Sequence, residues 1–175
     1  MSKPRKIFLL GVQGAGKTTL AKQLSLHLKL PVYYVDSIGF DSNWKQNSNE
    51  NIKRGFVEIV NRDKWILDGF YLECSDVICP NADLCIYIAS GRLRSYFNIF
   101  KRRLKSIRKD RIGTPEGSNN KVYFSLLKKV WKKNEKYSTL RFKELQCQYS
   151  SLEYITMKRI NRKTTLELID KLKTE

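Results

Sequence analysis

The amino-acid sequence predicts an α/β fold in which helices cover both faces of a parallel sheet. Short apolar runs alternate with longer segments of helical periodicity, and a glycine-rich phosphate-binding pattern joins the first apolar run to the first helical segment. Such alternation is typical of parallel sheets, because neighbouring parallel strands need a helix-sized crossover between them. The length of 175 residues suits one domain with a substantial core, so we expect residues 1–175 to form a single domain.

The first elements surround the phosphate-binding pattern. Residues 6–10 (Lys-Ile-Phe-Leu-Leu) are suited to a buried strand. Residues 11–18 read Gly-Val-Gln-Gly-Ala-Gly-Lys-Thr, which is a complete G-x-x-x-x-G-K-[ST] phosphate loop. Leucines at positions 20, 24 and 28 then recur at helical spacing. A strand, the loop and a helix in this order are the context in which the pattern binds nucleoside triphosphates.

Each residue type in the loop meets one need of a polyphosphate. Glycines allow backbone conformations in which successive N–H groups turn toward anionic oxygens. Lys17 can reach the β- and γ-phosphates, and the Thr18 hydroxyl can ligate Mg²⁺. The helix that begins near Gly16 adds its positive N-terminal dipole. We therefore expect ATP and Mg²⁺ as cofactors. The predicted nucleotide-binding residues in this segment are Gly11, Gly14, Ala15, Gly16, Lys17, Thr18 and Thr19.

The later elements continue the alternation. The predicted strands are 6–10, 32–35, 64–67, 84–89 and 153–157. The predicted helices are 17–29, 49–61, 92–108, 121–137 and 163–173. Two glycines, a proline and several small polar residues in 110–120 predict a loop between two basic helices, not a domain linker.

Two carboxylates follow predicted strands. Asp36 ends the run Val-Tyr-Tyr-Val, and Asp68 ends Trp-Ile-Leu. In open α/β sheets, ligands bind outside the carboxyl ends of the strands, so both side chains are predicted to face the crevice that holds the phosphate loop. Asp68 is expected to hold Mg²⁺ together with Thr18, and Asp36 to orient an acceptor hydroxyl or bind the metal through water. Strand-terminal aspartates also cap helices and form turns, which is the structural alternative.

Positive charge is concentrated in one part of the chain. Residues 92–143 carry 17 Lys and Arg but only 3 Asp and Glu, within a total net charge of +17. A solvated lysine-rich surface, a phosphate-clamping lid and a nucleic-acid-binding face all fit this pattern. The four cysteines show no C-x-x-C pairing and only one histidine is present, so reduced thiols are expected rather than a zinc site. No apolar run is long enough to span a membrane, and a cytoplasmic protein is expected.

Three segments together resemble a known family. They are the phosphate loop, the stretch from Pro-Val-Tyr-Tyr-Val-Asp-Ser-Ile-Gly-Phe (31–40) to Trp44, and Trp-Ile-Leu-Asp-Gly-Phe-Tyr (65–71). This arrangement resembles the bacterial topology-modulation proteins, which are small adenylate-kinase-like P-loop proteins. The resemblance covers almost the whole chain. It implies a three-layer P-loop nucleoside-kinase fold with a five-stranded parallel sheet in the order 2-3-1-4-5. It also implies a short basic lid at about 98–120.

The resemblance also assigns roles to single residues. Arg92, Arg102 and Arg103 match the family's lid arginines; Arg102 and Arg103 are predicted to be catalytic and Arg102 also to bind ATP. The predicted acceptor-binding residues are Asp36, Trp44, Arg54, Tyr71 and Arg92, with Lys53 as an alternative to Arg54. The predicted catalytic residues also include Lys17, Asp36 and Asp68. The sequence departs from the family pattern in two places. Asn98 stands where relatives usually have another lid arginine, and the segment after Tyr71 lacks the arginine that commonly binds an acceptor phosphate, for which Arg54 or Lys53 is the expected substitute.

Two functions remain open at the level of the sequence. The first is a P-loop phosphotransferase that transfers the γ-phosphoryl group of ATP to a nucleotide or another small acceptor. The second is a nucleic-acid-binding, DNA topology-modulating protein that uses the basic 92–143 segment, with ATP binding or slow ATP hydrolysis as a switch. Either protein is expected to work as a monomer or a homodimer.

Overall fold

The computed structural model describes residues 3–39, 47–69, 72–106 and 135–174. A five-stranded parallel sheet forms the centre, with the strand order β2-β3-β1-β4-β5. This order confirms the predicted fold. The strands are β1 (Lys6–Gly11), β2 (Val32–Tyr34), β3 (Trp65–Asp68), β4 (Leu84–Ile88) and β5 (Glu153–Met157).

The strand β1 lies in the middle of the sheet. It pairs with β3 on one side, where Leu9 is opposite Asp68, and with β4 on the other, where Gly11 is opposite Ile88. Nearly every residue of β1, β3 and β4 is buried, as expected for parallel strands that are covered on both faces. The phosphate loop therefore follows the best-protected strand of the sheet.

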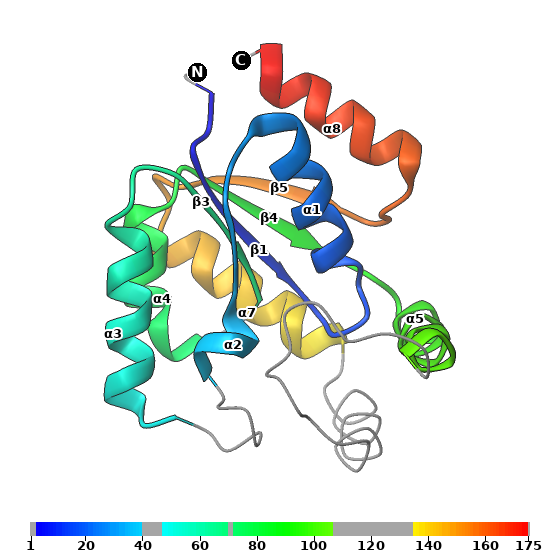
Figure 1. The fold of residues 1–175 in the computed structure, drawn as a ribbon, viewed down its shortest axis with the longest axis horizontal. Coiled ribbons are helices and arrows are strands. Elements are labelled where there is room, and N and C mark those ends of the chain that lie inside the picture. Colours follow the sequence, from blue (N-terminus) through cyan, green and yellow to red (C-terminus); the bar gives the residue numbers. More distant parts are fainter. Residues whose placement is uncertain (1–2, 40–46, 70–71, 107–134, 175) are drawn as a thin grey trace.

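One face of the sheet is covered by α1 (Lys17–Leu28) and α8 (Arg162–Thr174), as Figure 1 shows. Their buried side chains meet every second residue of the strands, because successive side chains of a strand point to opposite faces. The strand residues in this layer of the core are Ile7, Leu9, Ile66, Leu84, Ile86, Ile88 and Met157.

The opposite face is covered by α3 (Asn49–Val60), α4 (Ser75–Ile78) and α7 (Glu135–Gln148) (Figure 1). The other half of the alternating strand residues points into this layer, including the fully buried Trp65. The helix α3 starts behind Ser48, whose hydroxyl accepts a hydrogen bond from the backbone N–H of Asn51 at 3.3 Å. The two layers give the three-layer architecture of helices, sheet and helices.

The observed elements differ from the predicted ones in three places. β2 ends at Tyr34, and a short helix, α2 (Val35–Gly39), begins where the strand was expected to continue. Short helical segments before β4 were not predicted; they are the 3₁₀ turns η1 (Leu72–Cys74) and η2 (Cys79–Asn81), with α4 between them. Most of the predicted helix 121–137 lies outside the described residues, whereas α7 continues to Gln148, eleven residues past the predicted end.

The helix α5 (Arg92–Ser106) follows β4 and matches the start of the predicted helix 92–108. It lies at the end of the sheet where β1 runs into the phosphate loop (Figure 1). Within the described ranges, no helix is long and apolar enough to cross a membrane.

Candidate nucleotide site

The phosphate loop forms a tight turn directly after β1. The N–H of Ala15 donates to the carbonyl oxygen of Val12 at 3.2 Å, which closes a four-residue turn. Gly14 occupies the third position of this turn with φ 80°, the conformation that a type II turn requires there. The helix α1 then begins at Lys17, with Gly16 as its N-cap, so the first backbone N–H groups of α1 have no acceptor within the helix. The loop therefore presents backbone donors together with a helix N-terminus, which is a site for anions.

Lys17 folds back over this loop. Its Nζ donates to the carbonyl oxygens of Gly11, at 2.8 Å, and Val12, at 3.1 Å. The ammonium group is thus held at the start of the loop, and the side chain is half-buried. A cation in this position supplies the positive charge that the β- and γ-phosphates of a nucleotide need.

Two other segments stand against the loop. A Cβ atom at Gly14 would lie 2.4 Å from the Ser95 carbonyl oxygen of α5, and one at Gly16 would lie 3.4 Å from Ile160. Ile160 belongs to the connection between β5 and α8. These contacts with the loop could not be predicted, because neither of them leaves a spacing pattern in the chain. Both segments are candidates for contact with a bound nucleotide.

Asp68 lies at the carboxyl end of β3, beside the strand that carries the loop. It is only 7% exposed, and its register partners are Leu9 on β1 and Tyr34 on β2. No hydrogen bond or ion pair of its side chain is found within the described part of the chain. Burial raises the pKa of the Tyr34 hydroxyl above its ordinary value, and the nearby Asp68 carboxylate raises it further. The carboxylate is thus buried, without a partner there, and close to Tyr34.

Asp36 comes from the neighbouring strand end. It lies in the first turn of α2 and is exposed, whereas a position at the strand terminus was expected. Val35, which precedes Asp36, packs closely on Gly69, which follows Asp68. A Cβ atom added at Gly69 would lie 2.5 Å from the Cβ of Val35. The two aspartates therefore follow neighbouring strands and belong to segments in direct contact.

The donor groups near the loop fit Mg²⁺. Thr18 is half-buried in the first turn of α1, and Asp68 supplies a carboxylate without a hydrogen-bond or ion-pair partner in the described ranges. Among the described residues, no group of three or more His, Cys, Asp or Glu side chains could form an all-protein metal cage. Mg²⁺ characteristically takes one or two protein oxygens and completes its shell with water and phosphate. One hydroxyl and one carboxylate therefore suit this ion.

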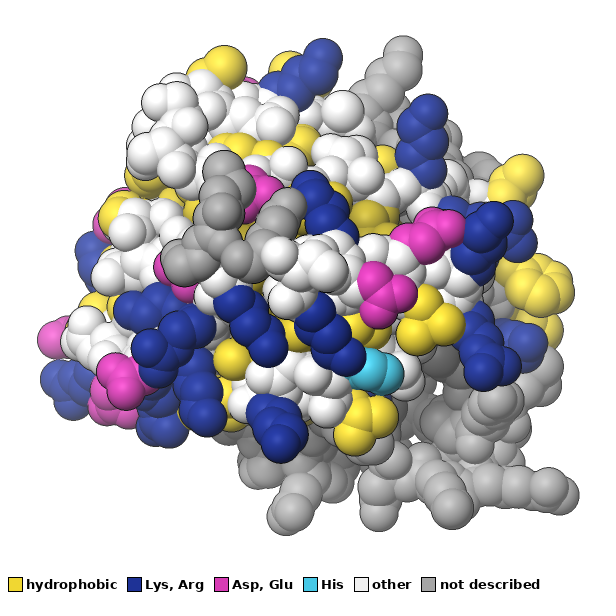
Figure 2. All heavy atoms as spheres, turned by 90° about the horizontal axis from the view of Figure 1, so that it is seen from above, with side chains coloured by type: hydrophobic (Ala, Val, Ile, Leu, Met, Phe, Trp, Pro, Cys, Tyr) yellow, Lys and Arg dark blue, Asp and Glu magenta, His cyan; other side chains and the backbone are white. Residues whose placement is uncertain are grey.

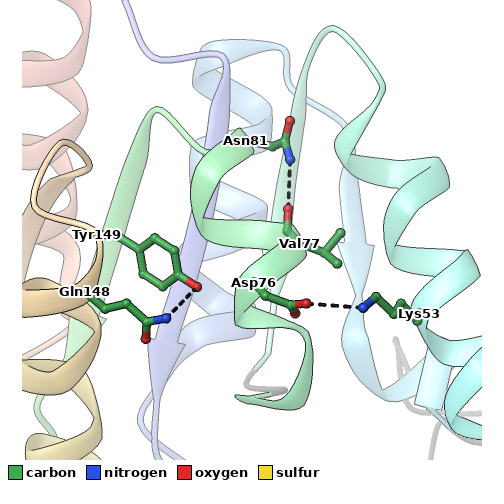
Figure 3. Close-up of polar contacts among 6 residues, drawn as sticks. All are labelled: Lys53, Asp76, Val77, Asn81, Gln148 and Tyr149. Carbon is green, nitrogen blue, oxygen red and sulfur yellow. Dashed lines mark hydrogen bonds and ion pairs between the residues drawn. The ribbon is translucent and has the colours of Figure 1, made fainter.

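The predicted acceptor side is only partly described. Arg54 is exposed on α3, and its neighbour Lys53 pairs with Asp76 of α4 at 3.2 Å (Figure 3). This surface ion pair directs Lys53 toward α4, so Arg54 is the better candidate of the two. Trp44 and Tyr71 lie outside the described residues.

The predicted lid arginines all fall on α5. Arg92, Arg102 and Arg103 belong to the helix, but their side chains are not described. The predicted lid at about 98–120 is likewise described only as far as residue 106. The roles predicted for these arginines therefore remain predictions.

Basic side chains also gather at the end of the molecule where the strands begin, away from the phosphate loop. Figure 2 shows this end, with Lys and Arg side chains spread among fewer Asp and Glu. Lys3, Arg5, Lys29 and Lys64 line a surface hollow of about 330 Å³, at the end of the sheet where the strands begin. The phosphate loop lies at the other end of the sheet, where the strands end, so the hollow does not belong to the nucleotide site. It was not predicted, because its lysines and arginine come from separate parts of the sequence.

Comparison with known proteins supports the fold. A profile of the ATPase family associated with various cellular activities (AAA) matches residues 7–68, which hold β1, the phosphate loop and β3. No curated protein sequence is similar enough to the chain to count as a match.

Several solved structures share the fold at low sequence identity. Deoxyadenosine kinase from M. mycoides with bound dCTP has 17% identity and a TM-score of 0.50, and the match covers 97% of this chain and 100% of that one. Shikimate kinase from Acinetobacter baumannii in complex with shikimate has 14% identity and a TM-score of 0.57, with 97% and 91% covered. The YorR protein of Bacillus subtilis in complex with phosphorylated GDP has 17% identity and a TM-score of 0.51, with 96% and 93% covered. The chain therefore has the fold of the P-loop kinases.

Proposed function

We propose that this protein is an ATP-dependent phosphotransferase, which moves the γ-phosphoryl group of ATP to a nucleotide or another small hydroxyl compound with the help of Mg²⁺. One observation carries the proposal: the phosphate loop with Lys17 follows β1, and the buried carboxylate of Asp68 ends the adjacent strand. Cation, backbone donors and carboxylate thus meet at the carboxyl ends of neighbouring parallel strands, where ligands bind in open α/β sheets.

The donor side would hold ATP through the loop. Lys17 and the N–H groups at the start of α1 would bind the β- and γ-phosphates. Thr18 and Asp68 would hold Mg²⁺, which supplies charge neutralisation on the phosphate oxygens when it is bound. Thr19, which is also predicted to bind the nucleotide, is exposed on the first turn of α1.

The transfer step needs a base and cations beside the γ-phosphate. Asp36 would accept the proton of the acceptor hydroxyl, whose oxygen forms a bond to the γ-phosphorus while the bond to the β,γ-bridging oxygen breaks and ADP leaves. Position 102 lies four residues after Asn98, on the side of α5 that meets the loop. This placement supports Arg102 as a ligand of the transferred phosphoryl group, with Arg103 next to it.

The acceptor is proposed by class alone. Arg54 and Arg92 would attract an anionic group such as a phosphate, and the aromatic rings of Trp44 and Tyr71 would contact a planar part of the acceptor. We also propose that the chain belongs to the topology-modulation proteins, a particular family with the P-loop kinase fold. The proposal further includes a cytoplasmic location, a single domain, and action as a monomer or homodimer.

A direct test compares two lysine variants. Lys17→Ala should lower MgATP-dependent product formation by about 10²–10³-fold, because it removes the cation at the transferred charge. Lys22→Ala, an exposed lysine on the same helix, should leave it unchanged. The substrates are a panel of nucleosides, nucleoside monophosphates and small hydroxyl compounds, with ATP hydrolysis measured in parallel. If Lys17→Ala turns over like the wild type, or if the wild type neither binds nor consumes ATP, the proposed function is wrong.

A further inference from the structure

The helix α5 touches the phosphate loop at the tip of its turn. The Ser95 carbonyl of α5 comes so close to Gly14 that a Cβ atom there would lie 2.4 Å from the oxygen. Ile99, one helical turn later, would lie 3.0 Å from the same Cβ through its Cγ1. Ser95 and Ile99 are 1% and 5% exposed, so this contact is closely packed.

A side-chain hydrogen bond joins the two elements at the same place. The Nδ2 of Asn98 donates to the carbonyl oxygen of Gly14 at 2.8 Å, and the side chain is half-buried. Asn98 is the position at which the family resemblance led us to expect an arginine. In this chain its amide is a donor to the loop backbone, and an amide is short enough to fit between a helix and a glycine in contact with it.

The bond determines the direction of the next peptide group. In a trans peptide, the C=O and the N–H point in opposite directions, so a Gly14 carbonyl held toward α5 turns the Ala15 N–H away from it. That N–H closes the turn by donating to Val12, whose carbonyl oxygen also accepts from Lys17. Asn98 thereby orders the same turn that holds the phosphate-binding lysine.

The first turn of α5, which precedes Asn98, is itself held in place by hydrogen bonds. The hydroxyl of Ser95 donates to that of Ser90 at 3.2 Å in a buried contact, and the Ser95 N–H donates to the Gly91 carbonyl at 3.1 Å. The first turn of α5 is therefore tied to the end of β4, which pairs with β1. A donor mounted in this way holds its partner with little freedom to move.

We propose that Asn98 is a positioning residue for the phosphate loop: it holds the Gly14–Ala15 peptide in the orientation that closes the turn, and so orders the loop that binds the phosphates of ATP. This inference rests on the proposed function, because it assumes that the loop binds ATP. It assigns to Asn98 a role in the loop itself, since its amide donates to the loop backbone and not to the substrate.

Two substitutions separate the hydrogen bond from the packing. Asn98→Leu has a similar volume but no donor, whereas Asn98→Gln keeps an amide donor on a longer side chain. Leu93→Ala is the control on the same helix, since Leu93 is 86% exposed. Loss of one hydrogen bond should speed amide exchange in residues 11–18 of the nucleotide-free Asn98→Leu protein by about 3–10-fold, with β3 and β5 unchanged. The dissociation constant for MgATP should rise by a similar factor. Asn98→Gln should recover part of both effects, and Leu93→Ala should show neither.

The two readouts keep the two proposals apart. Unchanged exchange in residues 11–18, or faster exchange with unchanged MgATP affinity, would overturn the role of Asn98. Equal acceleration throughout the protein would also overturn it, because that is loss of global stability. If the wild type binds no ATP, the proposed function fails, and with it the role in ATP binding; the exchange experiment then still decides whether Asn98 orders the loop.

Discussion

Replacing Gly14 by alanine puts a methyl group where the structure has no space. The new Cβ would lie 2.4 Å from the carbonyl oxygen of Ser95, and the neighbouring carbon of that carbonyl would be 3.0 Å away. Both atoms belong to the backbone of α5, so they cannot turn aside as a flexible side chain would. The backbone at Gly14 also has φ 80°, which residues with a side chain rarely adopt.

The cost has two separable parts. The positive φ should destabilise an alanine by roughly 1–2 kcal/mol. Crowding against α5 should add about 1–3 kcal/mol, as overpacking does in closely packed interiors. The free energy of unfolding should therefore fall by about 2–5 kcal/mol. At roughly 2–4 °C per kcal/mol for a domain of this size, the melting temperature should fall by about 4–20 °C.

Two other glycines serve as matched controls. Gly16 has φ 102°, but a Cβ there meets only Ile160 at ordinary contact distance, so Gly16→Ala should show the backbone cost of about 1–2 kcal/mol alone. Gly91 has nothing within 4 Å of the Cβ position, and Gly91→Ala should change stability by less than about 0.5 kcal/mol. Urea or thermal unfolding of the three variants without nucleotide tests the order. If Gly14→Ala is no less stable than Gly16→Ala, the close approach of α5 to the loop is refuted.

Three further predictions concern tyrosine and cysteine side chains. Asp68→Asn should lower the pKa of Tyr34 toward its ordinary value, because a neighbouring negative charge is removed; ultraviolet titration, with Tyr34→Phe as the reference, measures it, and an unchanged pKa would refute their proximity. Cys147 is exposed, whereas the other three cysteines are buried, so a thiol reagent at pH 8 should label one site quickly; fast labelling of two or more sites would contradict the structure. Burial raises the pKa of Cys79 to about 11. An unfolded thiol ionises near pH 8.5, so the unfolded chain binds fewer protons than the native one between about pH 8.5 and 11, and stability should fall as pH rises. Cys79→Ala should flatten this decline by up to about 1.4 kcal/mol per pH unit in chemical unfolding, and an unchanged slope would count against the burial of this thiol.

The separate strands and the phosphate loop could be predicted because each is a pattern of consecutive residues, whereas the order of the strands was implied by the family resemblance. The strands β1, β3 and β4 are buried on both faces, and so they appear as short apolar runs. The phosphate loop is a local pattern whose glycines, lysine and threonine leave little choice of position. The place of Asp68 could be predicted because a carboxylate at the end of an apolar run lies at the end of the sheet where the loop is, while its role stays a prediction.

The surroundings of the loop could not be predicted, since they depend on residues far apart in the chain. Asn98 meets Gly14, and Ile160 lies beside Gly16, yet neither contact leaves a periodic pattern. The helix α7 was largely missed for a different reason. Among residues 139–148, where the burial of α7 is described, only Phe142 and Leu145 belong to the buried core, so the apolar periodicity of this part is weak.

The central position of β1 has a consequence for the order in which the protein is made. Its two neighbours, β3 and β4, end at Asp68 and Ile88, so β1 gains both partners only after all residues up to Ile88 have left the ribosome. Until then its apolar residues and its unpaired backbone are exposed, together with the loop that follows. The nucleotide site therefore cannot form early in synthesis. A chain that stops before Ile88 should be prone to aggregate, whatever the quality of its phosphate loop.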